Sequence, residues 1–406
     1  MSTSVIPGAL PQGVASAAKI PPAPATIAKS VRLTSIDALR GFVMLLMLVD
    51  HTREFFYSHV AVGDPMAMTT PVPLFFTRLT AHLCAPVFVA LTGLSAYLYG
   101  ARRTRAETSA FLLKRGLFLV LLELTLVNLA WRLSFGSETL FLQVIWVIGL
   151  SMIALAALIH LPRPALIAVG AVIVLGHNLL DPIAFAPSET GHALWAILHD
   201  RGFIELPWGR ARTSYPLLPW IGTITLGYAI GPWFGRDVAA ALRLRRLAVT
   251  GIAMIAGFVL LRSINVYGDT PWQTGEDRVH TLLAFLNVTK YPPSADFLLL
   301  TLGIGALLLA AFERIGRPAA ILAILGGAPL FFYLVHLYAL DAVTWAARMT
   351  TDVDGLVRVP GVAWIWIVAA VLAVPAWFAC RGFAGFKRCS DEPWMRYLCS
   401  SCCDRR

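Results

Sequence analysis

The sequence predicts an all-α protein: a polytopic transmembrane helix bundle of about ten spans with both termini in the cytoplasm. Of its 406 residues, 58% are hydrophobic and only 14% are charged, whereas soluble domains carry about 25% charged residues. The apolar residues fall in blocks of about 20, the length that crosses a bilayer as an α-helix. These blocks continue from residue 36 to residue 386 without a gap that could hold a soluble domain. The lipid bilayer is therefore the first partner that we expect.

The two ends of the chain differ from the apolar middle. Residues 1–31 are rich in Ala, Pro and Ser, a composition typical of a disordered tail, and they lack the pattern of a signal peptide. We expect one transmembrane domain over residues 32–388 and a cytoplasmic tail over 389–406. The irregular spacing of Cys399, Cys402 and Cys403, with Cys389 nearby, argues against zinc, and we expect no metal. Reduced thiols or lipid-modified cysteines fit these positions as well.

The predicted spans follow the apolar blocks, and their order sets the orientation. They lie at 36–57, 74–100, 112–131, 140–160, 164–181, 214–234, 246–265, 294–313, 318–345 and 361–385. Lys and Arg then concentrate in the segments that an inside N-terminus leaves in the cytoplasm, as expected. The net charge of +10 reflects this orientation, so we expect no nucleic-acid partner. Three outer segments, 182–213, 266–293 and 346–360, are long enough for structured caps.

The first span carries the most informative residues. His51 follows Arg40 by eleven positions, about 16 Å along a helix, and ionisable residues at such depth are candidates for function. Asp50 lies three residues before Arg53 and four before Glu54, so these side chains share a face. One interpretation places the charges among lipid headgroups. The other makes His51 a general base tuned by Asp50, since histidine titrates near neutral pH.

Further polar residues could reach the same outer cavity. Arg78 and His82 are one helical turn apart; they either anchor the span at the interface or face His51 and the substrate. Lys290 precedes the stiff Tyr291-Pro292-Pro293 sequence, and it either anchors the chain or holds an anionic or sugar-like substrate.

For four other residues the structural interpretation is preferred. We expect interhelical hydrogen bonds for Glu123 and Gln143, a core role for His336, and a small packed residue at Cys84.

Seven separated blocks resemble one family of membrane proteins. They are RLTSIDALRGFVMLLMLVDHTREFF at the first span, TAHLCAPVFVALTG, LLKRGLFLVLLELT, QVIWVIGLSM, YPLLPWIGTITLGYAIG, FLNVTKYPPS and PLFFYLVHLY. In this order they are similar to the bacterial proteins grouped with the catalytic domain of heparan-α-glucosaminide N-acetyltransferase. The resemblance implies a transmembrane acyltransferase in a bacterial inner membrane. The co-substrate would be acetyl-CoA or another acyl-CoA, and the acceptor a sugar-like amine or hydroxyl at the periplasmic side.

The resemblance also implies a catalytic histidine at the outer end of the first span. The first-helix pattern, an Arg followed eleven residues later by a His, is similar to that of membrane acyltransferases that O-acylate bacterial polysaccharides, and this similarity places the catalytic histidine at His51. The human-type enzyme has Asn at that position, and a gapped match to it places the histidine at His59; we favour His51, because its spacing needs no gap. Arg53, Arg78 or His82 could stabilise the oxyanion, and Arg40, Arg102 and Arg103 would meet the phosphates of CoA.

Two other function classes stay open beside the enzyme. A transporter or channel for a small organic anion would use the same polar residues as a midplane site. A non-catalytic scaffold ranks last, because it leaves the paired ionisable residues unexplained. The oligomeric state, monomer or homodimer, is also open.

Overall fold

A computed structural model describes Met1 and residues 34–57, 70–135, 138–350 and 359–389. The predicted tails, 1–31 and 389–406, lie outside these ranges except for Met1 and Cys389. The described chain is mostly helical. Its helices in the first half are α1 (Thr34–Phe56), α2 (Val72–Ala81), α3 (Cys84–Gly100), α4 (Arg105–Leu122), α5 (Asn128–Phe135), α6 (Val144–Leu158), α7 (Arg163–Gly176) and α8 (His192–Leu198). Those in the second half are α9 (Leu218–Ala229), α10 (Ala240–Ile264), α11 (Arg278–Leu286), α12 (Ala295–Ile315), α13 (Arg317–Gly326), α14 (Pro329–Thr350) and α15 (Val362–Cys389).

Each predicted span contains a helix or a helix interrupted by a short break, although the span 140–160 begins with the short strand Leu140–Leu142 before its helix. The second span is divided into α2 and α3, and the ninth into α13 and α14. The third contains a π-helical turn, Glu123–Val127, between α4 and α5. Helix positions were therefore predictable from the apolar blocks, while the breaks were only partly marked by Pro86 and Pro329.

Six helical segments among the described residues are long and apolar enough to cross a membrane. They are Val72–Gly100, Arg163–Leu180, Ala240–Ile264, Ala295–Ile315, Pro329–Ala347 and Val362–Lys387. The first predicted span is not among them, since α1 carries Asp37, Arg40, Asp50, Arg53 and Glu54. This is a membrane protein, and its total number of crossings stays a prediction.

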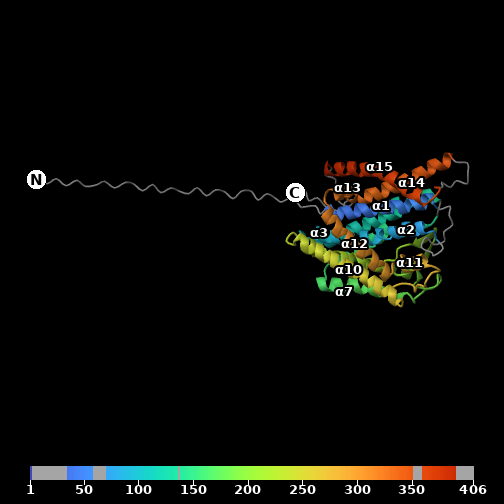
Figure 1. The fold of residues 1–406 in the computed structure, drawn as a ribbon, viewed down its shortest axis with the longest axis horizontal. Helices are drawn as coiled ribbons and strands as arrows, with labels where there is room; N and C mark the ends of the chain where they lie inside the picture. Colours follow the sequence, from blue (N-terminus) through green and yellow to red (C-terminus); the bar gives the residue numbers. More distant parts are fainter. Residues whose placement is uncertain (2–33, 58–69, 136–137, 351–358, 390–406) are drawn as a thin grey trace. The chain divides into compact units, whose positions relative to one another are not determined.

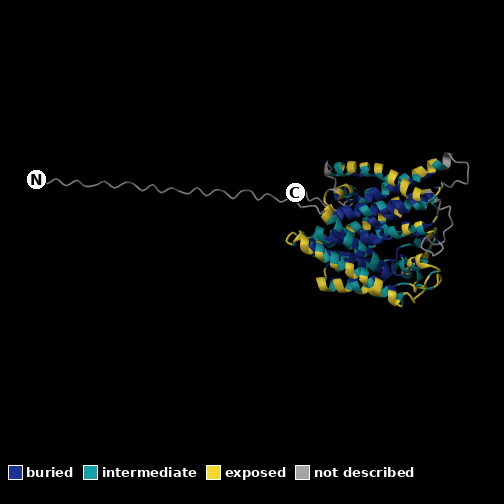
Figure 2. Ribbon diagram, in the orientation of Figure 1, coloured by how far each residue is buried: buried dark blue, intermediate teal, exposed yellow. Residues whose placement is uncertain are grey.

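Helix α1 can carry its charged residues because it is surrounded by protein rather than by lipid. It packs against α2, α3, α12, α13, α14 and α15, and most of its residues are buried (Figure 1). Figure 2 shows α1 as largely buried, while α7, α10 and α15 present exposed faces. Those faces carry large apolar side chains such as Val172, Ile252, Leu260, Val371 and Phe378. They form the surface that we assign to lipid.

The contact between α1 and α13 is unusually close. A Cβ added at Gly326 would lie 1.8 Å from the carbonyl oxygen of Asp37, and one added at Gly41 would lie 2.0 Å from that of Leu322. Only glycine allows the two backbones to approach this far, as small residues do between membrane helices. This contact holds the first half of α1 in place.

The segments 182–213 and 266–293, which were predicted to lie outside the membrane as structured caps, contain secondary structure. Strands β2 (Phe203–Leu206) and β3 (Gly209–Thr213) pair antiparallel, and β1 (Leu140–Leu142) pairs parallel to β3. The sheet order is β1-β3-β2. The predicted all-α class holds for the bundle as a whole, and this small sheet is an addition that the sequence did not predict. Most of the third segment, 346–360, lies outside the described residues.

Candidate functional site

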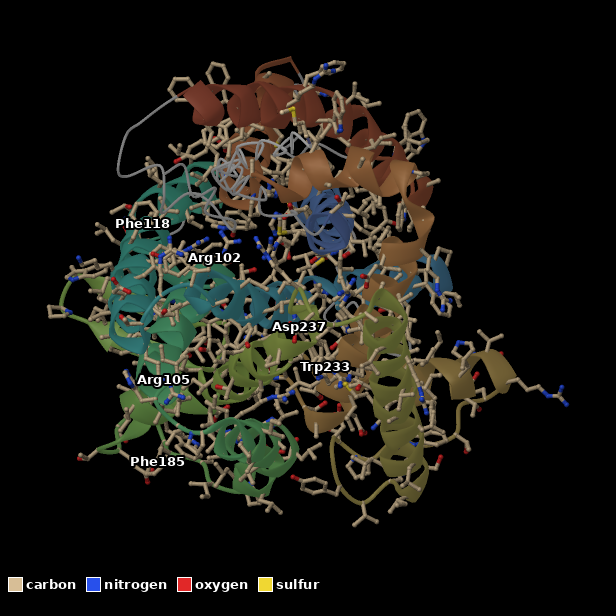
Figure 3. The ribbon with its side chains drawn as sticks, turned by 90° about the vertical axis from the view of Figure 1, so that its left-hand side faces the viewer. Arg102, Arg105, Phe118, Phe185, Trp233 and Asp237 are labelled. Atoms are coloured by element: carbon tan, nitrogen blue, oxygen red, sulfur yellow. The ribbon has the colours of Figure 1, made fainter. Side chains whose placement is uncertain are left out.

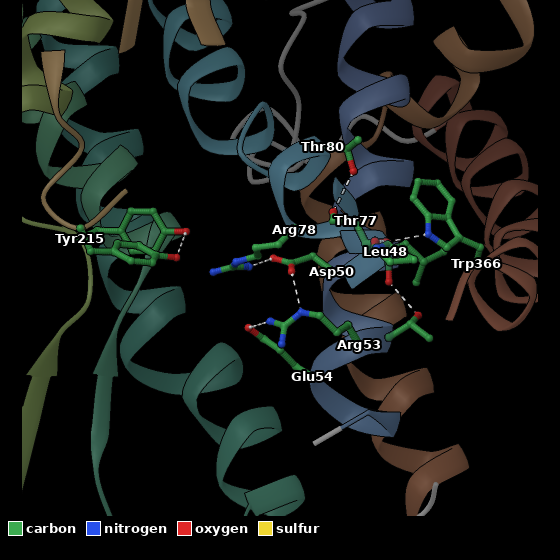
Figure 4. Close-up of polar contacts among 12 residues, drawn as sticks. Leu48, Asp50, Arg53, Glu54, Thr77, Arg78, Thr80, Tyr215 and Trp366 are labelled. Atoms are coloured by element: carbon green, nitrogen blue, oxygen red, sulfur yellow. Dashed lines mark hydrogen bonds and ion pairs between the residues drawn. The ribbon is translucent and has the colours of Figure 1, made fainter. Parts of the chain in front are cut away.

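The outer half of α1 and helix α2 meet through a buried carboxylate. Asp50 accepts a hydrogen bond from Arg53 Nε at 3.3 Å, one turn along α1. Arg78, on α2, pairs with the other oxygen of Asp50. Figure 4 shows both guanidinium groups directed at this carboxylate. The sequence predicted the Asp50–Arg53 face, and the structure adds Arg78 to it.

The charge network continues outward along α1. Arg53 also donates to Glu54 at 3.1 Å, and the Glu54 side chain is 33% exposed, compared with 11% for Asp50 and for Arg78. Asp50, Arg78 and Arg53 are therefore largely shielded from water, and Glu54 is more open to it. This gradient contradicts the interpretation of all these charges as simple headgroup contacts, because Asp50 and Arg78 are buried in protein.

Lys290 reaches the same network from the segment before α12. It is only 8% exposed, and its charge acts on Asp50, His51 and His82. Its neighbour Tyr291 donates to the hydroxyl oxygen of Tyr215 at 3.3 Å. Burial raises the pKa of Tyr291, but the nearby charges of Lys290 and Arg78 outweigh this and lower it. Sequence reasoning named Lys290 but gave no sign of Tyr215.

His51 is half-buried and enclosed by rings. Its Nδ1 lies 2.8 Å from Nε2 of His336, on α14. The edges of Trp131 and Tyr333 approach the His51 ring, with centroids 5.5 and 6.1 Å away. The expectation of a purely structural core role for His336 missed this contact. Only its position in an apolar helix could have indicated it, and that signal is weak.

His82 lies deeper than Arg78 on the same side of the bundle. It is 2% exposed, its ring packs on Phe297 at 5.2 Å, and it feels the charges of Lys290 and Arg78. Its Nδ1 has no hydrogen-bond partner among the described residues. Cys84, two residues further, donates to the carbonyl of Val43 at 3.2 Å, in agreement with its predicted packing role.

The predicted donor-binding arginines lie at the other end of the bundle. Arg102 is exposed and Arg103 half-buried, just after α3; Figure 3 views this end and shows Arg102 beside the ends of the helices. Arg103 lies over the Tyr99 ring, 3.9 Å from its centroid. Arg40 differs: it is 3% exposed and donates to Asp37 at 2.9 Å and to the Leu91 carbonyl at 3.1 Å. Its contacts are those of a helix-start ion pair.

Glu123 has the structural role that the sequence favoured. It is fully buried, and its carboxylate accepts from the Trp146 backbone N–H at 3.2 Å. The following turn is π-helical, and Asn128 there donates to the carbonyls of Glu123 and Phe141. These bonds join the π-helical turn and the start of α5 to β1 and to the first turn of α6.

Two predicted features lie outside the described residues. His59, the alternative base, is among them, and so are Cys399, Cys402 and Cys403. The structure therefore compares neither His59 with His51 nor the cysteine cluster with a metal site.

A cleft of about 360 Å³ runs along the other face of α2, lined by Pro73, Phe76, Thr77, Thr80, Val362, Ala363 and Trp366. Figure 4 shows Thr77 directed at Trp366, away from Arg78, and Trp366 donates to its hydroxyl at 3.1 Å. The cleft is mostly apolar and lies apart from His51.

The fold and the site define a class: a polytopic helical membrane protein with a histidine and a charge network buried in its bundle. The family model described as heparan-alpha-glucosaminide N-acetyltransferase, catalytic, matches residues 32–267. The match covers more than half of the chain, and the chain belongs to this family. It includes Asp50, His51 and Arg78, while Lys290 and His336 lie beyond it. A search of the curated proteins gave no match. The family gives the protein a transmembrane acetyltransferase-type function, with acetyl-CoA implied as co-substrate and a sugar-like acceptor as a fitting partner.

Proposed function

We propose that this protein transfers an acetyl or other acyl group from cytoplasmic acyl-CoA to an amine or hydroxyl of a sugar-like acceptor. The acceptor would be bound at the periplasmic side of a bacterial inner membrane, with both protein termini in the cytoplasm. The observation that carries the proposal is a buried charge network beside His51: Asp50, which is paired with Arg78, and Lys290 both act on His51 electrostatically. Family membership supplies the reaction type, and this cluster supplies groups that suit it.

His51 is proposed as the general base. It takes the proton from the attacking amine or hydroxyl while that atom forms a bond to the acyl carbonyl carbon. The carbon–sulfur bond of the thioester then breaks, and the imidazolium returns its proton to the departing CoA thiolate. Protons and charges balance with no further reactant. His59 is retained as the alternative base, because the resemblance described from the sequence permits either residue.

The cationic groups around His51 suit the charge that develops in this step. The tetrahedral intermediate carries a negative oxygen, which prealigned cations stabilise strongly in a water-poor site. Arg78 and Lys290 are buried cations, and Asp50 keeps Arg78 in position. Arg53 is more exposed and suits contact with the acceptor. His82, further in, is a candidate for contact with the thioester.

The donor is proposed to bind by its phosphates at the end of the bundle that carries Arg102 and Arg103. Phosphate contacts by arginine are charge-assisted and bidentate, and exposed Arg102 is free of the packing that holds Arg40. The pantetheine arm would then extend along the bundle toward His51. Arg40 is assigned to holding the start of α1 through Asp37.

The test is turnover by the purified protein in lipid nanodiscs. Acetyl-CoA and an α-glucosaminide are supplied together and separately, and free CoA and acetylated product are measured. Release of CoA coupled to product formation supports the enzyme. Movement of an organic anion across proteoliposomes with no consumption of acetyl-CoA would support the transporter instead.

A further inference from the structure

The contact between His51 and His336 has the geometry of an in-line hydrogen bond. The ring planes lie within 12° of each other, and the centroids are 5.0 Å apart. Because Nδ1 of His51 and Nε2 of His336 are 2.8 Å apart, both nitrogens lie between the two rings. One proton lies between these two nitrogens. The other contacts of His336 determine which of the two rings carries this proton.

The other nitrogen of His336 fixes its proton. Nδ1 of His336 lies 2.8 Å from the carbonyl oxygen of Phe332, one turn earlier on α14. A carbonyl only accepts hydrogen bonds, so this Nδ1 carries a hydrogen. His336 is 2% exposed and packs against the rings of Phe332 and Tyr333.

A charged His336 ring is disfavoured in this environment, because a buried charge needs a partner. Among the residues that the structure describes, none of the ion pairs includes His336. The ring is therefore neutral. With its hydrogen on Nδ1, its Nε2 is an acceptor, and Nδ1 of His51 must be the donor.

We infer that His336 is a positioning residue that holds the proton of His51 on Nδ1 and thereby leaves Nε2 as its basic nitrogen. The hydrogen bond made by one ring nitrogen of a histidine selects the tautomer of the other. The edges of Trp131 and Tyr333 restrict rotation of the same ring. This inference deepens the proposed function and rests on it for its consequence in catalysis. The tautomer itself rests on geometry alone.

The consequence for the reaction is specific. Nε2 of His51 receives the acceptor proton, and the imidazolium that forms keeps its Nδ1–H bond to His336. A base held in place by a third group is the general arrangement of activated nucleophiles and their bases. Without an acceptor at position 336, the proton of His51 is free to move to Nε2, and the basic lone pair then faces the protein.

The first test reads the tautomer without activity. The protein is labelled with ¹⁵N-histidine, and solid-state spectra are recorded at neutral pH, with His51→Asn used to assign the His51 signals. We expect the Nδ1 of His51 to be protonated and its Nε2 to be unprotonated. A protonated Nε2 and bare Nδ1 in the wild type would overturn the inference, whatever the activity.

The second test uses two matched substitutions. His336→Gln keeps an acceptor oxygen near the same place, and His336→Met keeps similar bulk without a strong acceptor. We expect His336→Met to lower kcat by about 10²-fold, at the lower end of general-base contributions, with the KM for acetyl-CoA unchanged. We expect His336→Gln to recover most of this loss.

The outcomes separate this inference from the proposed function. Equal losses in folded His336→Gln and His336→Met, or wild-type kcat in His336→Met, would overturn the positioning role. Absence of turnover in the wild type together with the expected ¹⁵N pattern would refute the proposed function and leave the tautomer assignment standing.

Discussion

Replacing Asp50 by Asn should destabilise the fold through the charge that it leaves behind. The substitution conserves shape and removes the negative charge that Arg78 and Arg53 share. Arg53 keeps Glu54 as a partner, whereas Arg78, with an 11% exposed side chain, loses the ion pair. Removing one partner of a buried pair costs about 3–5 kcal/mol. Because Arg53 keeps a partner, we expect Asp50→Asn to lower the free energy of unfolding by about 3 kcal/mol, the lower end of this range.

Glu54→Gln is the matched control on the same helix. It also removes a carboxylate from Arg53, but Glu54 is 33% exposed, and exposed pairs contribute about 0–1 kcal/mol. Unfolding by a denaturing detergent in mixed micelles, monitored by helicity, gives the free energies of unfolding for the wild type and both variants.

A double-mutant cycle with Arg78→Gln then isolates the pair. We expect Asp50→Asn and Arg78→Gln together to cost less than the sum of the single substitutions, with a coupling of about 1–3 kcal/mol. Equal effects of Asp50→Asn and Glu54→Gln, or strict additivity with Arg78→Gln, would refute the assignment of a buried, mutually dependent pair.

Three further predictions address packing, donor binding and orientation. Gly326→Ala should force α1 and α13 apart and lower the free energy of unfolding by about 1–3 kcal/mol, whereas Gly382→Ala in α15, where an added Cβ meets nothing within 4 Å, should not; equal effects in the same detergent titration would contradict the close contact. Arg102→Gln should raise the Kd for acetyl-CoA by about 10- to 150-fold, from the loss of a charge-assisted bond of about 1.5–3 kcal/mol, and the exposed Arg278→Gln should leave calorimetric binding unchanged; an unchanged Kd in both would remove Arg102 from the donor site. Reporter fusions at residues 108 and 240 should be cytoplasmic and those at 195 and 275 periplasmic, since the Lys- and Arg-rich segments stay inside; a cytoplasmic signal at 195 would overturn the span order.

The helix positions could be predicted because membrane helices are marked by long apolar blocks. The burial of α1 fits one of the two interpretations that the sequence left open for Asp50 and Arg53, the other being contact with lipid headgroups. The divisions between α2 and α3 and between α13 and α14 depend on local breaks near Pro86 and Pro329, for which the apolar blocks give no exact position. The small β-sheet was missed because its strands are only three to five residues long, and because β1 lies at the start of an apolar block that was assigned to the predicted span 140–160.

The site was predictable only within single helices. Asp50 and Arg53 share a face by helical spacing, and Arg78 and His82 are one turn apart. Their meeting across helices depends on packing that periodicity does not describe. His336 was missed because it lies 285 residues from His51 in an apolar helix, where a histidine carries no sign of its partner. Tyr215 was missed because its contact with Tyr291 also joins residues that are far apart in the sequence.

The central claim is that His51 acts as the base in acyl transfer, and one measurement tests it most directly. The rate of CoA release from acetyl-CoA with an α-glucosaminide is compared for the wild type, His51→Ala and His59→Ala in nanodiscs, with acetyl-CoA binding measured in parallel. A positioned base contributes about 10²–10⁴-fold to rate, so His51→Ala should lose that factor while its acetyl-CoA binding and His59→Ala turnover stay near wild type. Loss of turnover in His59→Ala alone, or full CoA release in both variants, would contradict the account.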